Sequence, residues 1–320
     1  MIAVVLWGVL AFLMAVITIL FGYFFIEAFL KSKKKRIKHP KLLLLPLGLV
    51  TVSLLLIWQT THAYGRYQIA QEEAAKAAEQ AKAEQEKDQF NQQVTQDFEK
   101  LFKDQPGQIS ATILDSTGAA ITNINGTTTN QTASLYKPLA AMSAFHLLEQ
   151  GKIESDEESQ IIQDMKPALL QSDNATGVDL ADNIVGWDRL ADTMHELDFS
   201  SFEILDPIYN APGISSQDMA TFFYQLNQGK LVNADHTQQI LTLLGQSYEP
   251  WPIDQKDLDA YDYTNKYGNL DDVYNDSGIL KTPNGKTYYL AFMVNHWQST
   301  STELSNLYAQ IETTLAKHLK

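Results

Sequence analysis

Ser134 and Lys137, two residues that can exchange a proton, stand three positions apart. On a helix this spacing puts both side chains on one side, close enough to interact. A serine hydroxyl is a weak nucleophile until a base removes its proton, and a desolvated lysine can be that base. Pro138 favours a helix start here, because a first-turn residue needs no intrahelical N–H partner. The pair therefore predicts a nucleophile at a helix N-terminus, where free N–H groups would also stabilise an oxyanion.

Taken alone, this short pattern also fits a surface serine followed by an ordinary solvated lysine. Two further motifs follow in the chain and bear on the choice, Ser172-Asp173-Asn174 and Lys266-Tyr267-Gly268. Metal chemistry has less support, because the chain has no cysteine and its seven histidines show no ligand spacing. We therefore expect neither a metal ion nor a cofactor.

In these three motifs and their order, the sequence resembles the penicillin-recognising serine hydrolases, which comprise the class A β-lactamases and their D,D-peptidase relatives. The resemblance extends from about Gly107 to Lys320. It includes the flanking segments Ile184-Val185-Gly186-Trp187 and Ile214-Ser215-Ser216-Gln217-Asp218-Met219-Ala220.

The resemblance implies a role for each matching position. Ser134 would attack an acyl carbonyl, with Lys137 as its base. Ser172 would pass a proton to the leaving nitrogen, and Asn174 would orient Lys137. Lys266 would attract the substrate carboxylate, and the backbone N–H groups of Ser134 and Asn269 would form the oxyanion hole. The implied substrate-binding residues are Asn174, Lys266, Tyr267, Gly268 and Asn269.

Two positions depart from the family pattern. Tyr267 stands where the family has a small hydroxyl residue that contacts the substrate carboxylate, and the larger phenol puts that contact in question. Asp206-Pro207-Ile208-Tyr209-Asn210 resembles the family's Glu-Pro-x-x-Asn loop, with a shorter aspartate in place of the deacylating glutamate. Asp206 is therefore either a hydrolytic base or a residue that caps its loop.

A second lysine competes for the third motif. Lys281-Thr282-Pro283 is similar to the family's Lys-Thr-Gly, but that motif lies on a strand that a second strand follows. Residues 269–279 fit such a second strand after Lys266, whereas Lys281 leads directly into a Pro-Asn-Gly turn. We therefore assign the motif to Lys266.

The segments that must position these residues alternate between strand and helix patterns. Residues 109–121 predict a hairpin around Asp115-Ser116-Thr117-Gly118, and strands return at Asp272–Leu280 and Tyr288–Val294 on either side of a turn at 282–285. The expected helical segments are Leu139–Leu148, Leu180–Leu197, Ser216–Leu226, Thr237–Leu244 and Thr302–Leu319. With the resemblance, this order predicts an α/β (α+β) fold of the β-lactamase/D,D-peptidase type. Its antiparallel sheet would be built from both ends of the domain and covered by helices, with a helical subdomain.

Two long apolar runs precede this domain, at residues 2–30 and 42–58, each near the length that spans a bilayer as a helix. The loop between them, Lys31 to Lys41, carries seven positive charges, which favours the cytoplasmic side. Residues 1–65 therefore predict a two-helix transmembrane hairpin in contact with lipid. The rest of the chain would lie outside the cell, which we expect to be a Gram-positive bacterium.

Residues 66–103 contain neither glycine nor proline and are rich in Ala, Glu, Gln and Lys, which predicts a helical stalk. Phe90, Val94 and Phe98, near its end, are expected to dock onto the domain of residues 104–320. From residue 67 onward the chain holds 16 basic and 37 acidic residues, a net charge of about −21. This acidity argues against nucleic acid as a partner.

These features favour a membrane-anchored extracytoplasmic serine hydrolase that β-lactams acylate on Ser134 and that hydrolyses them. Two alternatives stay open. A penicillin-binding D,D-peptidase would act on peptidoglycan stem peptides and release β-lactams slowly. A non-catalytic wall-binding or sensor domain would keep the fold without the reaction.

Overall fold

The computed structural model describes the backbone of residues 2–34, 44–206, 208, 210–247, 258 and 260–320, and the side chains of these residues apart from those within 2–11, 32–34 and 44–50. The chain divides into two compact units, Met1–Lys87 and Asp88–Lys320. Helix α2 (Leu44–Phe102) contributes to both units. The second unit therefore includes the end of the segment that the sequence assigns to the stalk.

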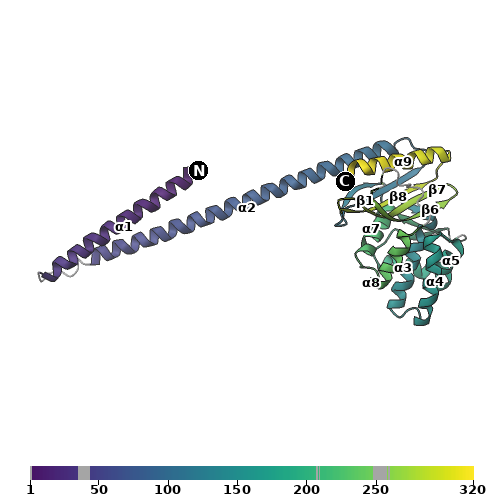
Figure 1. The fold of residues 1–320 in the computed structure, drawn as a ribbon, viewed down its shortest axis with the longest axis horizontal. Helices are drawn as coiled ribbons and strands as arrows, with labels where there is room; N and C mark the ends of the chain where they lie inside the picture. The colour runs from purple at the N-terminus through teal and green to yellow at the C-terminus, as the bar shows by residue number, and fades with distance from the viewer. Residues whose placement is uncertain (1, 35–43, 207, 209, 248–257, 259) are drawn as a thin grey trace. The chain divides into compact units, whose positions relative to one another are not determined.

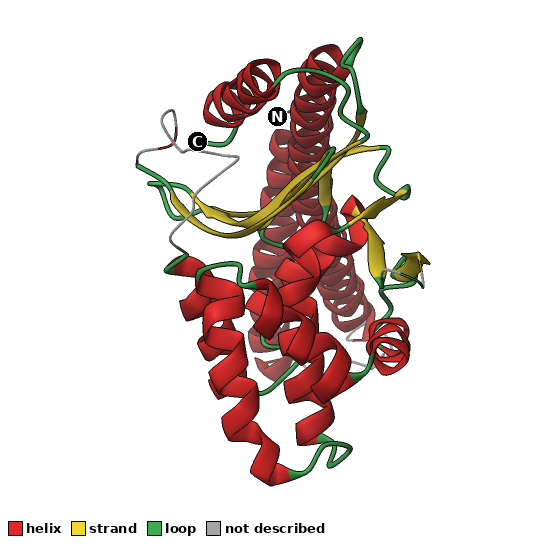
Figure 2. Ribbon diagram, turned by 90° about the vertical axis from the view of Figure 1, so that its right-hand side faces the viewer, coloured by secondary structure: helices red, strands yellow, loops and turns green. Residues whose placement is uncertain are grey.

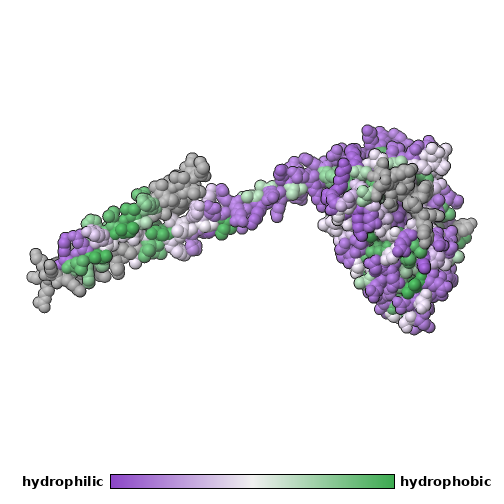
Figure 3. All heavy atoms as spheres, viewed as in Figure 1, coloured by the Kyte–Doolittle hydropathy of each residue, from purple (hydrophilic) through white to green (hydrophobic). Residues whose placement is uncertain are grey.

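The first unit consists of α1 (Ile2–Lys34) and the longer part of α2. Among the described residues, one stretch, Phe12–Lys31, is long and apolar enough to cross a membrane, and Figure 3 shows hydrophobic side chains along it. The first four residues of the predicted basic loop, 31–34, belong to α1, whereas residues 35–41 of that loop and the start of the second predicted span lie outside the described residues. Side chains from Arg66 to Gln89 are exposed, as expected for a solvated helix.

The second unit is built on a five-stranded antiparallel sheet in the order β2-β1-β8-β7-β6. Its strands are β1 (Gln108–Leu114), β2 (Ala120–Ile124), β6 (Asp262–Leu270), β7 (Val273–Lys281) and β8 (Thr287–Asn295). Strands from both ends of the domain therefore form one sheet, which confirms that part of the predicted fold. A smaller sheet, β3 (Thr129–Gln131), β5 (Ala211–Ser215) and β4 (Glu203–Asp206), was not predicted, because its strands are too short to show a pattern.

Both predicted turns are present. The N–H of Gly118 donates to the carbonyl of Asp115, and the N–H of Gly285 donates to that of Thr282, each at 2.9 Å. Gly118 and Gly285 have φ angles of 82° and 84°, a region in which glycine pays no steric cost. These glycines explain why the hairpins could be placed from sequence.

Helices cover both faces of the sheet (Figures 1 and 2). The end of α2 and α9 (Ser301–His318) pack on one face. On the other face, α7 (Ser216–Asn227) and α8 (Ala234–Gly245) contact the sheet. The remaining helices on this side pack mainly on one another and on α8: α3 (Tyr136–Glu149), α4 (Glu158–Leu170), α5 (Asn174–Val178) and α6 (Trp187–Glu196). The prediction of one helix over Leu180–Leu197 is wrong. Gly186 has a φ of 87° and separates a π-helical turn, Asp179–Val185, from α6.

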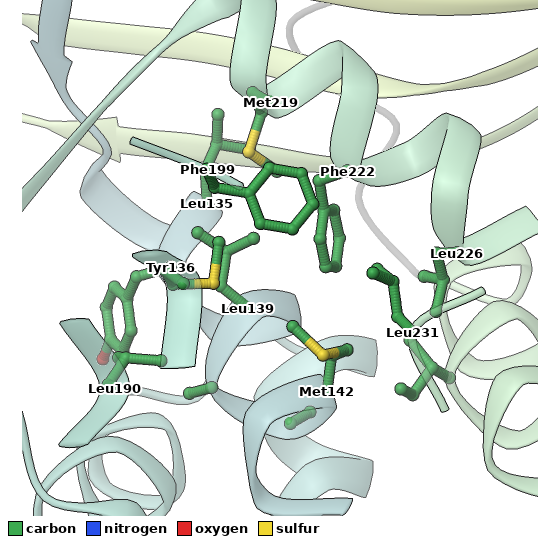
Figure 4. Packing of buried hydrophobic residues seen from close by; sticks show 14 of the residues in the cluster. Leu135, Tyr136, Leu139, Met142, Leu190, Phe199, Met219, Phe222, Leu226 and Leu231 are labelled. Atoms are coloured by element: carbon green, nitrogen blue, oxygen red, sulfur yellow. The ribbon is translucent and has the colours of Figure 1, made fainter. Parts of the chain in front are cut away.

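Two apolar cores hold the unit together. In the first, Leu139 and Met142 of α3 face Phe222 and Leu226 of α7 (Figure 4), and all four are fully buried. In the second, the ring centroids of Phe98 and Phe292 lie 5.7 Å apart between α2 and the sheet. Val94 and Phe98 are fully buried there, so the predicted docking of the last turns of α2 is confirmed. Because residues along the whole of α3 are buried in the first core, this core fixes the helix that begins two residues after Ser134.

Candidate active site

Ser134 lies in one 3₁₀ turn, Ala133–Leu135, that leads directly into α3. Ala133 has a φ of 45°, a left-handed conformation that costs energy in a residue with a Cβ and that is concentrated at functional sites. Pro138 is buried in the first turn of α3, where its missing N–H costs little. Ser134 is partly exposed and lines a cleft of about 310 Å³.

Lys137 is completely buried, and its ammonium group is held by the next motif along the chain. Nζ donates to the carbonyl of Ser172 at 2.5 Å and to Oδ1 of Asn174 at 2.8 Å, and it lies 3.4 Å from Oγ of Ser172. A Cβ on Gly177 would lie 2.6 Å from Cε of Lys137. Glycine at this position therefore leaves room for the lysine stem beside α5.

The Ser172-Asp173-Asn174 motif leads into α5, which begins at Asn174. Ser172 has a φ of 54°, so a second residue of the site is in the left-handed region. Oδ1 of Asp173 accepts hydrogen bonds from the backbone N–H and the hydroxyl of Thr176, both at 2.9 Å. This N-cap fixes Asn174 as the first residue of the helix, with Oδ1 on Lys137.

Lys266 comes from β6, the strand at the edge of the large sheet. Nζ lies 2.9 Å from Oγ of Ser172 and 2.7 Å from the carbonyl of Tyr267, and it sits 4.1 Å from the centroid of the Tyr267 ring. A Cβ on Gly268 would lie 2.5 Å from the carbonyl oxygen of Thr132 and 3.1 Å from the backbone nitrogen of Ser134. The edge strand is therefore packed against the turn that carries Ser134.

Lys137, Ser172, Asn174 and Lys266 thus form one hydrogen-bonded group, which links three segments distant in the chain. Among the described residues, no hydrogen bond joins Oγ of Ser134 to Nζ of Lys137. The cleft is lined by Ser134, Asn174 and Asn269 together with Gln131, Ala133, Tyr136, Val178, Trp187, Asn210, Ala211, Pro212 and Leu270.

Burial sets the protonation of two residues at the start of α3. Burial lowers the pKa of Lys137 to about 8, and the nearby Asp173 carboxylate opposes this shift. Burial also raises the pKa of Tyr136 to about 12, with a smaller contribution from Asp173. A neutral amine at Lys137 is therefore accessible at mildly alkaline pH, whereas the Tyr136 phenol stays neutral.

The competing lysine and the tentative acid lie outside this group. Lys281 is half-exposed at the end of β7, and its Nζ lies 3.8 Å from the Asp262 carboxylate. Asp206 ends β4, and its Oδ1 accepts a hydrogen bond from the backbone N–H of Ile208 at 2.8 Å. Asn210, from the same loop, lines the cleft, whereas Asp206 is not among the described lining residues.

Two features of the site had not been expected from sequence. Nδ2 of Asn275, on β7, donates to the carbonyls of Gln131 and Thr132 at 2.8 and 3.1 Å and so ties the segment before Ser134 to the sheet. A polar Asn-Asp-Ser run in the middle of a predicted strand is a signal for such a role, because a buried amide needs hydrogen-bond partners. The rings of Tyr136 and Trp187, 5.4 Å apart, form an aromatic part of the cleft wall.

Comparison with known proteins identifies the same family. The model of the β-lactamase enzyme family matches residues 93–168 and 160–319, which together exceed half of the chain. No curated protein matches the chain.

Among solved structures, the TLA-1 extended-spectrum β-lactamase superimposes with a TM-score of 0.63 at 16% identity, over 72% of this chain and 99% of its own. A class A β-lactamase from Bacteroides cellulosilyticus gives 0.63 at 15% identity, over 72% and 98%. PBP-A gives 0.62 at 18% identity, over 72% and 96%. At these low identities the structural matches establish only that the fold is shared. Membership of the family rests on the match to the family model. This chain belongs to the β-lactamase enzyme family.

Proposed function

We propose that the chain is an extracytoplasmic serine acyl-transferring hydrolase that forms an acyl-enzyme on Ser134 with amide or lactam carbonyls. The observation that carries this proposal is the hydrogen-bonded group of Lys137, Ser172, Asn174 and Lys266 beside a serine that lines a cleft. A solvated lysine after a surface serine would not be completely buried and held by a second motif.

The proposed reaction follows from these contacts. Neutral Lys137 accepts the Ser134 proton as Oγ attacks the carbonyl carbon. The backbone N–H groups of Ser134 and Asn269 stabilise the resulting oxyanion, since such donors are worth about 3 kcal/mol each at the transition state. Ser172 donates its proton to the leaving nitrogen and regains one from Lys137, 3.4 Å away, while Lys266 holds its Oγ at 2.9 Å. Water or an amine then attacks the ester and releases Ser134.

The rate of this last step separates a β-lactamase from a D,D-peptidase. Rapid release of a β-lactam needs a base that activates water, and Asp206 is the sequence-predicted candidate. Its hydrogen bond to the Ile208 N–H and its absence from the described cleft lining favour the loop-capping role. Between these two we therefore favour a penicillin-binding enzyme that keeps its β-lactam adduct over a β-lactamase that releases it.

This proposal is tested with a chromogenic cephalosporin added to the purified chain in detergent. We expect a burst of about one product per chain, followed by slow turnover. Sustained rapid hydrolysis that Asp206→Asn abolishes would instead establish β-lactamase activity. The absence of both burst and turnover would favour the non-catalytic alternative.

The proposed acylation should increase as the pH rises. Because burial lowers the pKa of Lys137 to about 8, the amine is protonated and inactive below this value and neutral above it. We expect the acylation rate to rise about tenfold per pH unit below pH 8 and to level off above it. Rates measured with a fluorescent penicillin between pH 5.5 and 9.5 check this.

The Asp173→Asn variant provides a control for that pH profile. Asparagine can still cap α5, but the variant lacks the carboxylate that raises the pKa of Lys137. The pH range over which the acylation rate of this variant rises should therefore move to lower pH. If this pH range stays in place or moves to higher pH, the result would contradict the proposal that Lys137 is the base.

Gly177→Ala should reduce acylation without weakening α5. The added Cβ would lie 2.6 Å from Cε of Lys137, so the lysine must shift, and a displacement of about 1 Å can cost roughly 100-fold in rate. Alanine itself favours a helix by about 1 kcal/mol over glycine. Gly245→Ala is the matched control, because its Cβ would meet Thr264 at an ordinary 3.4 Å. Equal acylation rates for the two variants would count against the placement of Lys137.

We also propose that residues 2–30 and 42–58 both cross the membrane and leave the domain outside the cell. Phe12–Lys31 and the seven charges of the following loop support this topology. Because the chain has no cysteine, single cysteines at Ser32 and Ser116 can report it. A membrane-impermeant maleimide should label Ser116→Cys in intact cells and Ser32→Cys only after lysis. Labelling of Ser32→Cys in intact cells would refute the arrangement.

A further inference from the structure

The cleft beside Ser134 offers no charged side chain to a ligand among the described residues that line it. Its polar groups are the amides of Gln131, Asn174, Asn210 and Asn269, with the hydroxyls of Ser134 and Tyr136. Amide side chains donate and accept hydrogen bonds and match peptide groups well. The remaining lining is aliphatic or aromatic. The described lining therefore suits a neutral, peptide-like acyl donor.

The two lysines of the motifs beside the cleft, Lys137 and Lys266, are already engaged. Lys137 is 0% exposed and Lys266 1%, and neither lines the cleft. The Lys266 ammonium is held by the hydroxyl of Ser172, the carbonyl of Tyr267 and the face of the Tyr267 ring, 4.1 Å from its centroid. Such a cation–π contact occupies a side of the ammonium that a carboxylate would otherwise approach.

The surroundings disfavour an anion as well. Between residues 88 and 320 the sequence has one arginine, Arg189, which is exposed on α6 and is not among the lining residues. Asp271 and Asp272 are exposed directly after Leu270, which lines the cleft. Among the residues that the structure describes, a carboxylate bound here would meet no accessible cation, and Asp271 and Asp272 would add like charges.

We infer that the substrate is uncharged where it meets β6, with an amide or ester in place of a free carboxylate, and that Tyr267 sets this preference. This inference rests on the proposed acyl-enzyme chemistry and specifies its substrate class. Lys266 then serves to hold and polarise Ser172, and the cleft amides recognise the neutral chain.

The test compares benzylpenicillin with its methyl ester, two compounds that share the reactive lactam and differ in one charge. Adduct formation is followed by intact mass on the full chain in detergent, for the wild type and for Tyr267→Ser and Tyr267→Phe. We expect the wild type to react with the ester at least as fast as with the free acid. Tyr267→Ser should raise the acid-to-ester ratio about tenfold or more, the size expected for a hydrogen bond to a charged group. Tyr267→Phe keeps the ring over Lys266 and should keep the wild-type ratio.

The outcomes separate the two proposals. A wild-type preference for the free acid of tenfold or more would overturn the neutral-substrate inference and leave the acyl-enzyme proposal intact. A ratio that Tyr267→Ser leaves unchanged would overturn the role of Tyr267. No adduct from either compound would overturn the acyl-enzyme proposal, and the inference with it. Because each variant is judged by a ratio, partial loss of folded protein does not affect the result.

Discussion

Ser134→Ala is expected to abolish covalent labelling of the chain by a fluorescent β-lactam. Loss of the nucleophile of a serine hydrolase costs on the order of 10⁶ in rate, so no labelled band should remain. Ser134 is partly exposed, and its Oγ makes no hydrogen bond within the described part of the chain. The substitution should therefore change the free energy of unfolding by less than about 0.5 kcal/mol.

Ser143 gives a matched control on the same helix. It lies on α3, and its buried Oγ has no hydrogen-bond partner among the described residues. Ser143→Ala therefore removes a hydroxyl that stabilises nothing, and the variant should label like the wild type. Labelling that persists in Ser134→Ala, or disappears equally in both variants, would contradict the assignment of Ser134 as the nucleophile.

Gly268→Ala should have the next largest effect, because its new Cβ would meet backbone atoms. The carbonyl oxygen of Thr132 would lie 2.5 Å away and the nitrogen of Ser134 3.1 Å away, so β6 must move away from the turn. The proposed oxyanion donors at Ser134 and Asn269 would then separate, and loss of one such donor costs about 10² to 10³ in rate. Strain of this kind also costs about 1–3 kcal/mol in stability.

Acylation of Gly268→Ala is measured per folded molecule, with thermal unfolding followed in parallel. Gly107→Ala is a control for strain alone, since its Cβ would meet the carbonyl oxygen of Asn295 at 3.2 Å, and neither residue lines the described part of the cleft. This variant should lose stability and keep its acylation rate. A Gly268→Ala protein that acylates at the wild-type rate would refute the proposed oxyanion site.

The parts of the domain that were predictable from sequence have local signals. The turns at Gly118 and Gly285 require positive φ, and Asp173 before Asn174 is an N-cap. Lys266 could be separated from Lys281 because a strand follows the first and a turn follows the second. In each case the feature is decided by residues a few positions apart, which a single sequence displays.

The parts that could not be predicted depend on tertiary contacts. The break at Gly186 interrupts an apolar pattern that otherwise fits one helix, and the pattern does not show that this glycine takes a positive φ. The contact between the Tyr267 ring and Lys266 depends on how β6 packs against Ser172. Asn275 acts on Gln131 and Thr132, more than 140 positions earlier in the chain. Such pairings become visible only once the sheet is assembled.

The most direct test of the acyl-enzyme proposal is the mass of the intact chain, followed over time after addition of benzylpenicillin and, separately, of its methyl ester, with peptide mapping of any adduct. We expect one ligand mass to be added per chain, located on the peptide that contains Ser134 and lost only slowly. An adduct on another residue, or an unmodified mass with both compounds at every time, would contradict the proposed acyl-enzyme.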